Sequence, residues 1–478
     1  MLMKCKWKWG LGTLAAALAT AAPAFAQDAP KIDTGDTAWV LVSAALVLLM
    51  TPGLAFFYGG LVRGKNALNT LMMSFVALGV IALVWTLVGY SIAFGPGNGY
   101  FGSFAWLGLN GVGQEPNAAQ AATVPHLAFM IFQMMFAVIT PALISGAIVD
   151  RMKFKTYVVF IMLWSVVVYS PVAHWVWSLG NPDPTDAAKM LPGWLGAIGA
   201  LDFAGGTVVH LTAGISALVA AIILGPRKGF PNQPMTPHNV PFVLLGAGLL
   251  WFGWFGFNAG SALAANGLAS LAFVTTNVAT AAALSTWLLL DTFIGGKPTA
   301  VGAATGAVVG LVAITPAAGF VSPLSSIAIG GTAAIISFGA IQLKKKLNYD
   351  DSLDVFACHG MGGLTGAILT GVFADKSLNS LGDNGLLLGN GAQLVEQLIG
   401  VGATAVYAAV CTTVILLVLK FTLGLRPSEE AEQEGLDTAE HGEEAYTGSI
   451  GGLGAMEEAM SSSTQGQGFT RPATQQQE

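Results

Sequence analysis

Long apolar runs separated by short polar segments make up most of the chain. Eleven runs are long enough to cross a bilayer as a helix, which takes about 20 residues. They cover approximately residues 37–60, 68–95, 124–149, 154–178, 203–225, 241–263, 270–293, 299–318, 323–343, 353–374 and 391–422. The runs are continuously apolar, whereas strands of a membrane β-barrel alternate apolar and polar positions. The pattern predicts an all-α polytopic membrane protein with eleven transmembrane helices.

The composition agrees with this pattern. Hydrophobic residues make up 54% of the 478 residues and charged residues only 10%, compared with about 25% charged residues in a soluble domain. The formal net charge of -6 says little about partners, because the charges lie in loops and in the C-terminal tail. Cys5, Cys358 and Cys411 form neither a disulfide framework nor a metal-binding motif.

The N-terminus has the three parts of a secretory signal. Lysines within the first eight residues precede an apolar run over residues 11–22, and Ala24-Phe25-Ala26 forms an A-x-A cleavage pattern. We expect residues 1–26 to be a signal peptide, with an uncleaved signal anchor as the alternative. The transmembrane domain would then cover residues 27–426.

Basic residues in the connections predict the orientation. They gather in the loops that follow odd-numbered runs: Arg63, Lys65, Arg151, Lys153, Lys155, Arg227, Lys228, Lys297 and Lys344 to Lys346. The loops after even-numbered runs hold only Lys189 and Lys376. Because cytoplasmic loops carry an excess of Lys and Arg, we expect a periplasmic mature N-terminus and a cytoplasmic C-terminus.

Ionisable residues inside two of the apolar runs indicate a functional site. Asp202 and His210 lie eight residues apart, about two helical turns on nearly one face. A second intramembrane histidine, His359, follows in the tenth run. Such groups are costly in a membrane and usually face the bundle interior or a cavity. The plainer alternative is that Asp202 only caps its helix and that His210 only bonds to a neighbouring helix.

The two histidine-bearing runs predict an internal repeat. HLTAGISALV from His210 and HGMGGLTGAIL from His359 each place a histidine before a small-residue apolar stretch. Five spans per half would make the halves, about 37–225 and 241–374, opposite in orientation. Functional sites of inverted repeats lie where the halves meet. The run at 391–422 would be a long eleventh helix outside the repeat.

Aromatic residues gather near the predicted external side. HWVW ends at Trp177, FQMMF runs from Phe132 to Phe136, and WFGWFGFNAGS includes Trp254 and Phe257. Aromatic faces attract a desolvated cation. The alternatives are an interfacial belt for Trp177 and simple core packing for Phe136 and Phe257.

The sequence lacks common enzyme motifs. Among enzyme signatures, HExxH, Walker A and GxSxG are all missing from the sequence.

The C-terminal tail is acidic. From Pro427 onward, the chain has eleven acidic residues and one basic residue, Arg471. Residues 427–447 are expected to form a short cytoplasmic structure, or else a merely solvated acidic tail, and residues 448–478 read as disordered.

Several continuous strings resemble the Amt/Mep/Rh ammonium transporter family, most closely its bacterial Amt branch. They are YGGLVRGKN, DFAGGTVVH, GWFGFNAGSA, DVFACHG and EGLDTAEHGEEAY, and the resemblance extends over about residues 35–447. It implies an eleven-helix inverted-repeat protomer in a homotrimer, with one pore in each subunit.

The resemblance also implies roles for individual residues. Trp177, Phe132 and Ser261 would recruit ammonium at an external site, with Asp202 buried beneath it. Phe136 and Phe257 would be the stacked rings that gate its lower end. His210 and His359 would be the twin histidines of an apolar pore, with Trp254 nearby, and Asp354 would anchor the start of the tenth span.

The expected function is ammonium uptake across a bacterial inner membrane, with methylammonium as an analogue substrate. The ion would lose its proton and cross as ammonia, and relay of that proton by the histidine pair is a hypothesis. The resemblance further implies that residues 427–447 bind a P-II-type signalling protein. We expect no enzyme activity, cofactor, metal or nucleic acid. The alternatives are an ammonium sensor that signals through P-II proteins and an Rh-like channel for neutral ammonia or carbon dioxide.

Overall fold

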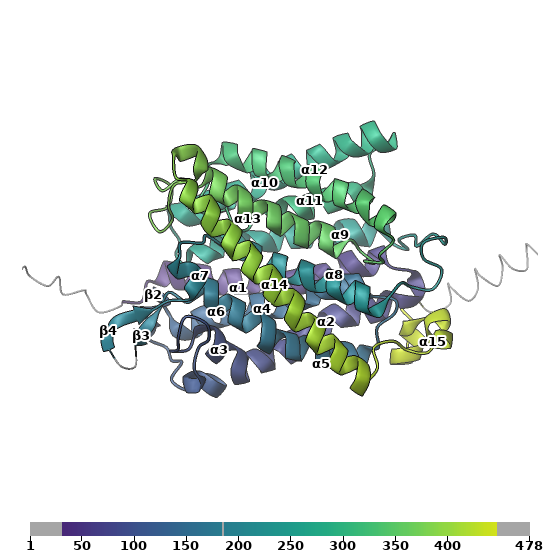
Figure 1. Ribbon diagram of the computed structural model, residues 1–478, viewed down its shortest axis with the longest axis horizontal. Helices are drawn as coiled ribbons and strands as arrows, with labels where there is room; N and C mark the ends of the chain where they lie inside the picture. Colours follow the sequence, from purple (N-terminus) through teal and green to yellow (C-terminus); the bar gives the residue numbers. More distant parts are fainter. Residues whose placement is uncertain (1–30, 184–185, 447–478) are drawn as a thin grey trace, which may run out of the picture.

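The structure is a computed structural model, and it describes residues 31–183 and 186–446. The proposed signal peptide, residues 1–26, and the proposed C-terminal extension, residues 448–478, lie outside the described residues. Within the described part, helices form a bundle of roughly parallel rods (Figure 1).

The first five spans match the first five apolar runs. Their elements are α1 (Thr34–Leu61); α2 (Ala67–Val84), η2 (Trp85–Gly89) and α3 (Tyr90–Phe94); α4 (His126–Ile148); α5 (Phe154–Trp164), η4 (Ser165–Tyr169) and α6 (Ser170–Trp177); and η5 (Gly206–Leu211) with α8 (Thr212–Leu224). The η segments named here are π-helical turns that continue the neighbouring helices.

The remaining six spans follow in the same way. Their elements are α9 (Val240–Trp254), η6 (Phe255–Ala259) and η7 (Gly260–Ala262); α10 (Gly267–Leu290) with η8 (Asp291–Gly295); α11 (Ala300–Ile314); α12 (Pro323–Leu347); η9 (Phe356–Met361) with α13 (Gly362–Phe373); and α14 (Gly391–Thr422). In the described chain, ten helical stretches are long and apolar enough to cross a membrane, and α11 is a shorter apolar helix. The prediction of eleven transmembrane helices is confirmed.

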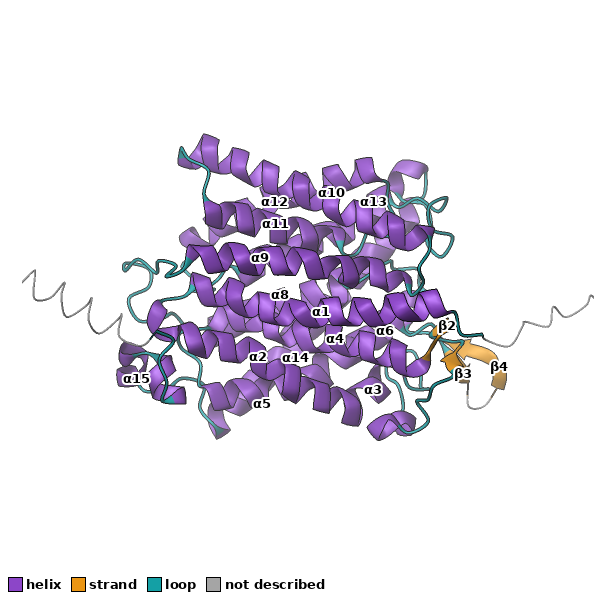
Figure 2. Ribbon diagram, turned by 180° about the vertical axis from the view of Figure 1, so that it is seen from behind, coloured by secondary structure: helices purple, strands orange, loops and turns teal. Residues whose placement is uncertain are grey.

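The two ends of the bundle differ. One end, here called the strand end, carries two antiparallel hairpins that the sequence did not predict, β1 (Pro116–Asn117) with β2 (Ala121–Pro125) and β3 (Asn181–Asp183) with β4 (Asp186–Leu191). It also carries η3 (Phe104–Leu109), α7 (Trp194–Ala197) and η10 (Leu386–Leu388). The other end, the tail end, carries η1 (Gly64–Asn66), α15 (Glu429–Glu434) and η11 (Asp437–His441). Figure 2 shows the strands and α15 at opposite ends.

Small residues allow the two halves to pack closely. Spans one and six meet where Gly246 faces the backbone of Phe57, so closely that a Cβ at Gly246 would clash. Spans five and ten meet in the same way, because a Cβ at Gly214 would strike the backbone of Gly360. Glycine therefore lets these helices approach to backbone distance.

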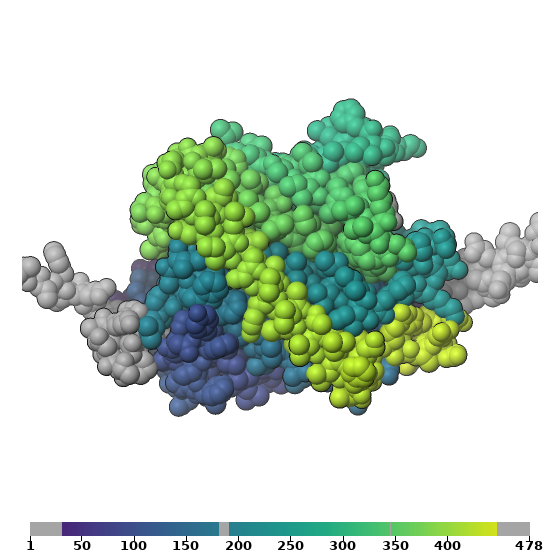
Figure 3. Space-filling model, in the orientation of Figure 1, coloured from purple at the N-terminus to yellow at the C-terminus, as the bar shows by residue number. Residues whose placement is uncertain are grey.

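The long helix α14 lies outside the paired halves. Figure 3 shows it as a yellow-green band running diagonally over the surface from the strand end toward α15. Its inner face contacts α8 and α13. With 32 residues it exceeds the length of a perpendicular crossing, and its oblique path fits the tilt expected of a long span.

Candidate functional site

An open vestibule lies at the strand end of the bundle, with about 1620 Å³ of space that includes the solvent at its mouth. Four of the residues singled out from the sequence line it: Phe136, Trp177, Asp202 and Ser261. Phe132 does not belong to this lining. It is fully buried beside Phe136, with ring centroids 4.9 Å apart.

Two side chains that line the vestibule, Trp177 and Ser261, are each held by a hydrogen bond to a backbone carbonyl oxygen. Trp177 donates its indole N–H to the carbonyl oxygen of Asp202 at 2.9 Å, which orients the indole ring. Ser261 donates its hydroxyl hydrogen to the carbonyl oxygen of Phe257 at 2.9 Å. Because a hydroxyl oxygen also accepts hydrogen bonds, Ser261 retains acceptor capacity for an N–H donor in the vestibule.

The carboxylate of Asp202 is occupied by the start of span five. It accepts the backbone N–H groups of Gly205, Gly206, Thr207 and Val208 at 2.6–3.1 Å, and also the Thr207 hydroxyl. These are the donors that the first turn of a helix leaves without intrahelical partners. Asp202 therefore acts as the cap of η5, and both of its oxygens are engaged.

Two closely packed, tilted aromatic rings separate the vestibule from the interior. Phe136 and Phe257 lie with centroids 4.2 Å apart at an interplanar angle of 36°. Phe136 lines the vestibule, whereas Phe257 lines a second cavity deeper in the bundle. The aromatic pair is thus the partition between the two spaces.

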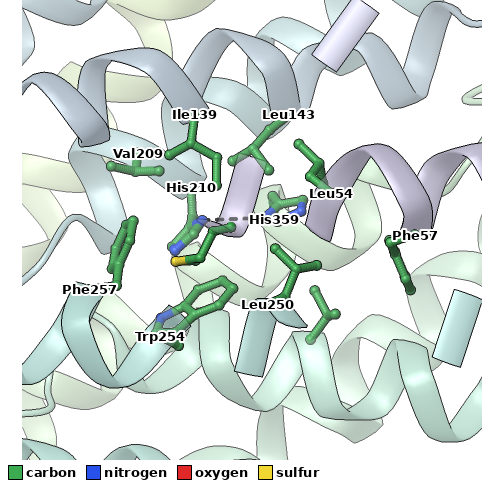
Figure 4. Close-up of a pocket in the computed structure, with 12 residues that line it drawn as sticks. Leu54, Phe57, Ile139, Leu143, Val209, His210, Leu250, Trp254, Phe257 and His359 are labelled. Atoms are coloured by element: carbon green, nitrogen blue, oxygen red, sulfur yellow. Dashed lines mark hydrogen bonds between the residues drawn. The ribbon is translucent and has the colours of Figure 1, made fainter. Parts of the chain in front are cut away.

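The inner cavity is narrow and almost wholly apolar. Its walls are Met50, Leu54, Phe57, Ile139, Leu143, Val209, His210, Leu250, Trp254, Phe257, Val308 and His359. The polar groups in this lining are the imidazoles of the two histidines and the indole N–H of Trp254. Figure 4 shows both imidazoles among aliphatic and aromatic neighbours.

The two imidazoles are hydrogen-bonded to each other. Their Nδ1 atoms are 3.2 Å apart, and the rings lie nearly parallel at 25°. One Nδ1 must carry the proton and the other must accept it. The pair therefore holds opposite tautomers, and moving the shared proton requires a matching change at the two Nε2 atoms.

The remaining contacts of His210 are aromatic. Trp254 stacks on it at 5.4 Å and 22°, and Phe257 lies 6.0 Å away at 24°. Trp254 is fixed by donating its N–H to the hydroxyl of Thr315 at 3.0 Å. Within the described residues, the buried Nε2 of His210 has no hydrogen-bond partner. This nitrogen can therefore form a hydrogen bond with a small molecule in the cavity.

The start of span ten is capped by a residue that the sequence reasoning missed. The carboxylate of Asp351 accepts the backbone N–H groups of Val355 at 3.1 Å and Phe356 at 2.7 Å. Asp354, expected to anchor this start, forms an ion pair with Lys344, accepts the backbone N–H of Cys358 at its carbonyl oxygen and adopts a left-handed φ of 59°, and its anchoring role stays a prediction. The missed signal was spacing, since Asp351 precedes His359 by eight residues, as Asp202 precedes His210.

The segment after span eleven is folded against the tail end of the bundle. Asp437 accepts the backbone N–H groups of Leu68 at 3.0 Å and Asn69 at 2.7 Å, and burial raises the pKa of its carboxyl. Leu436 donates its N–H to the side-chain oxygen of Asn66 at 2.8 Å. The tail up to Tyr446 is therefore docked rather than merely solvated.

Comparison with known proteins places these features in one family. A model described as Ammonium Transporter Family matches residues 38–446. A curated ammonium transporter of Bacillus subtilis is 49% identical over 417 residues, which cover 87% of this chain and 99% of the relative.

Solved structures agree with the fold. The crystal structure of Saccharomyces cerevisiae Mep2 has a TM-score of 0.76 at 37% identity, covering 84% of this chain and 89% of that one. A structure described as a sensor Amt protein has a TM-score of 0.77 at 31% identity, covering 85% and 98%. The relatives are named as transporters rather than enzymes, and this chain belongs to the ammonium transporter family.

Proposed function

We propose that this protein takes up ammonium by binding the ion in the vestibule, transferring its proton to vestibule water or to the histidine pair, and passing ammonia through the inner cavity. The observation that carries the proposal is the hydrogen-bonded pair His210–His359 inside an apolar cavity, behind the closely packed rings of Phe136 and Phe257. This arrangement suits a solute that is cationic outside and neutral inside.

The vestibule supports recruitment of a cation. The indole of Trp177 offers a π face, worth about 0.5–2 kcal/mol to a cation, and the Ser261 hydroxyl offers an acceptor oxygen. Phe132 lies behind Phe136, so its part would be to support that ring. Asp202 contributes chiefly by holding the η5 backbone, and its charge adds a favourable field for the ion.

The inner cavity supports selectivity by deprotonation. An isolated ion in an apolar cavity costs many kcal/mol, and potassium cannot lower this cost because it has no proton to lose. Ammonia is neutral and can exchange hydrogen bonds with imidazole nitrogens. The open Nε2 of His210 is placed to interact with it directly beneath Phe257.

The hydrogen bond between the imidazoles also supports a proton relay, which would make transport electrogenic. The test is current across membranes containing purified protein after a jump in ammonium and, separately, in potassium. A current with ammonium alone, lost in the variant with both His210→Ala and His359→Ala, is the expected result. A luminal pH rise without current would mean that the proton stays behind. If His210→Ala left current and pH dependence intact, the relay would be excluded.

The membrane setting follows the distribution of basic residues. We propose a bacterial inner membrane, with the strand end periplasmic and the tail end cytoplasmic. If a reporter fused after Lys346 proved periplasmic, the orientation would be the opposite of the one proposed.

Exposed apolar side chains on α10 and α14, such as Phe273 and Val406, leave surfaces for lipid and for the partner subunits of a homotrimer. The mass of the detergent-solubilised protein tests that assembly.

The docked tail supports a regulatory partner. We propose that residues 427–447 bind a P-II-type protein at the tail end. Removing the chain after Pro427 should abolish co-purification with such a protein, and unchanged co-purification would remove this role.

A second candidate is an ammonium sensor with little flux. The observation in its favour is the likeness to the structure described as a sensor Amt protein. Flux separates the two, because a sensor would bind ammonium without producing either current or luminal alkalinisation.

A further inference from the structure

Part of the vestibule lining is polar, and not all of its polar groups have hydrogen-bond partners among the described residues. Gln393 and Glu396 lie in the first turns of α14 and both line the vestibule, together with Asp383. Residues three apart on a helix are surface neighbours. The side chains of Gln393 and Glu396 therefore present an amide and a carboxylate to the same region.

The orientation of the Gln393 amide is fixed by its donors. Its Nε2 donates to the carbonyl oxygen of Gly199 at 2.9 Å and lies 3.5 Å from the side-chain oxygen of Gln397. The carbonyl oxygen Oε1 of Gln393 has no partner in the described part of the chain, although the residue is fully buried. A buried acceptor without a donor is unfavourable, and Gln393 belongs to the vestibule lining, so a donor or cation bound there would satisfy this oxygen.

The carboxylate of Glu396 is also uncompensated. Neither a salt bridge nor a hydrogen bond engages it within the described residues, and it packs over the Cα of Gly199. Asp383 adds a second negative charge on the same wall, partly balanced by Lys376 at 3.3 Å. The region therefore attracts cations and repels anions.

The number of ligands narrows the class of cation. Ca²⁺ takes six to eight oxygen ligands, commonly with several carboxylates, and the described residues contain no group of three or more His, Cys, Asp or Glu that could hold a metal ion. One carboxylate and one amide oxygen suit a monovalent cation that keeps part of its water. Ammonium adds N–H donors that match both oxygens.

We propose that Gln393 and Glu396 form an outer cation-binding site, at which partly hydrated ammonium binds before it reaches Trp177. The identity of the ion rests on the proposed function, whereas the existence of a monovalent cation site does not. The site raises the local concentration of the ion in the vestibule that Phe136 also lines.

The test combines diffraction with transport kinetics. Crystals of the purified protein soaked in thallium(I) acetate should show an anomalous peak within coordination distance of Gln393 Oε1 and the Glu396 carboxylate. Glu396→Gln, which keeps the shape of the side chain, should abolish the peak. A wild-type protein without a peak there, or a peak that persists in Glu396→Gln, overturns the proposal and assigns the unpaired oxygen to water.

In methylammonium uptake, Glu396→Gln should raise KM about two- to fivefold at low ionic strength and leave the maximal rate unchanged, since it removes one attracting charge. The increase should shrink as salt is added. The matched control is Glu115→Gln, which removes one exposed charge at the same end but outside the vestibule lining. An unchanged KM in Glu396→Gln, or an equal rise in the control, would overturn the role in uptake. If the wild-type protein moves no methylammonium at all, the proposed function fails, while the thallium peak still decides the site.

Discussion

Spans five and ten use one structural device twice, in opposite directions. In each, an aspartate caps a π-helical turn and a histidine follows eight residues later, at Asp202–His210 and Asp351–His359. A glycine stands four residues after each histidine, and both glycines lie against the opposite span. This is the inverted repeat expressed in individual contacts, and it delivers the two imidazoles to one point.

The surroundings of the two devices differ. Asp202 receives five hydrogen bonds and opens on an aromatic vestibule, whereas Asp351 receives two backbone bonds and lies beside Lys344 and Asp354. Aromatic rings stack on His210, whereas in the described chain the one ring that stacks on His359 is that of His210. The scaffold is therefore symmetric, whereas the surroundings are not, because the aromatic vestibule lies beside the cap of span five.

The largest expected effect tests whether the two histidines act as one unit. His210→Ala and His359→Ala should each reduce ammonium current by at least about 10²-fold, the contribution of a positioned proton-transfer group. The double variant should cost no more than either single one, because residues acting as a unit are not additive. Current in reconstituted vesicles is the measurement. Losses that multiply in the double variant would mean that the imidazoles work independently.

Alanine substitutions at Gly214 and Gly363 should show that spans five and ten approach more closely at Gly214 than at Gly363. A methyl group at Gly214 meets the immobile backbone of Gly360, so Gly214→Ala should cost roughly 3 kcal/mol of unfolding free energy, the upper range for overpacking. Gly363→Ala meets the Gly206 carbonyl oxygen at 2.7 Å and His210 Cβ at 3.0 Å and should cost less.

Thermal unfolding in detergent measures both variants. The control is Gly248→Ala in α9, where a Cβ would meet no atom within 4 Å and helix propensity favours alanine. Equal stability of Gly214→Ala and Gly248→Ala would contradict the close crossing of spans five and ten.

Substituting the two capping aspartates should destabilise the protein to different extents, more at Asp202 than at Asp351. Asp202→Asn replaces an acceptor oxygen by a donor that faces backbone N–H groups, so we expect a loss of roughly 2–3 kcal/mol. Asp351→Asn disturbs only two bonds and should cost about 1 kcal/mol or less at pH 7. Ammonium binding and current are measured alongside thermal stability. An Asp202→Asn protein that binds and conducts normally would exclude a need for the charge.

Much of this arrangement could be predicted from the sequence, because apolar length and the rarity of intramembrane charge are local signals. The eleven spans and the positions of Asp202, His210 and His359 came from those signals. Asp351 was missed because sequence identity between the halves is slight and Asp354 stood closer to the span. The hairpins and the docking of Asp437 onto Asn69 depend on contacts between distant segments, which no local pattern encodes.

The smallest expected effect concerns the pH dependence of the second cap. Burial, opposed by Lys344 and reinforced by Asp354, raises the pKa of Asp351 from its usual value to about 6. The folded protein therefore holds this proton more tightly than the unfolded chain does. The resulting stabilisation is complete below about pH 4 and is lost as the pH rises through 6. Between pH 5 and 7 the wild-type protein should lose roughly 1 kcal/mol relative to Asp351→Asn, which has no carboxyl to titrate. Unfolding curves of both proteins at the two pH values measure this difference. If the difference in unfolding free energy between wild type and variant were the same at both pH values, Asp351 would be ionised throughout, like an exposed aspartate.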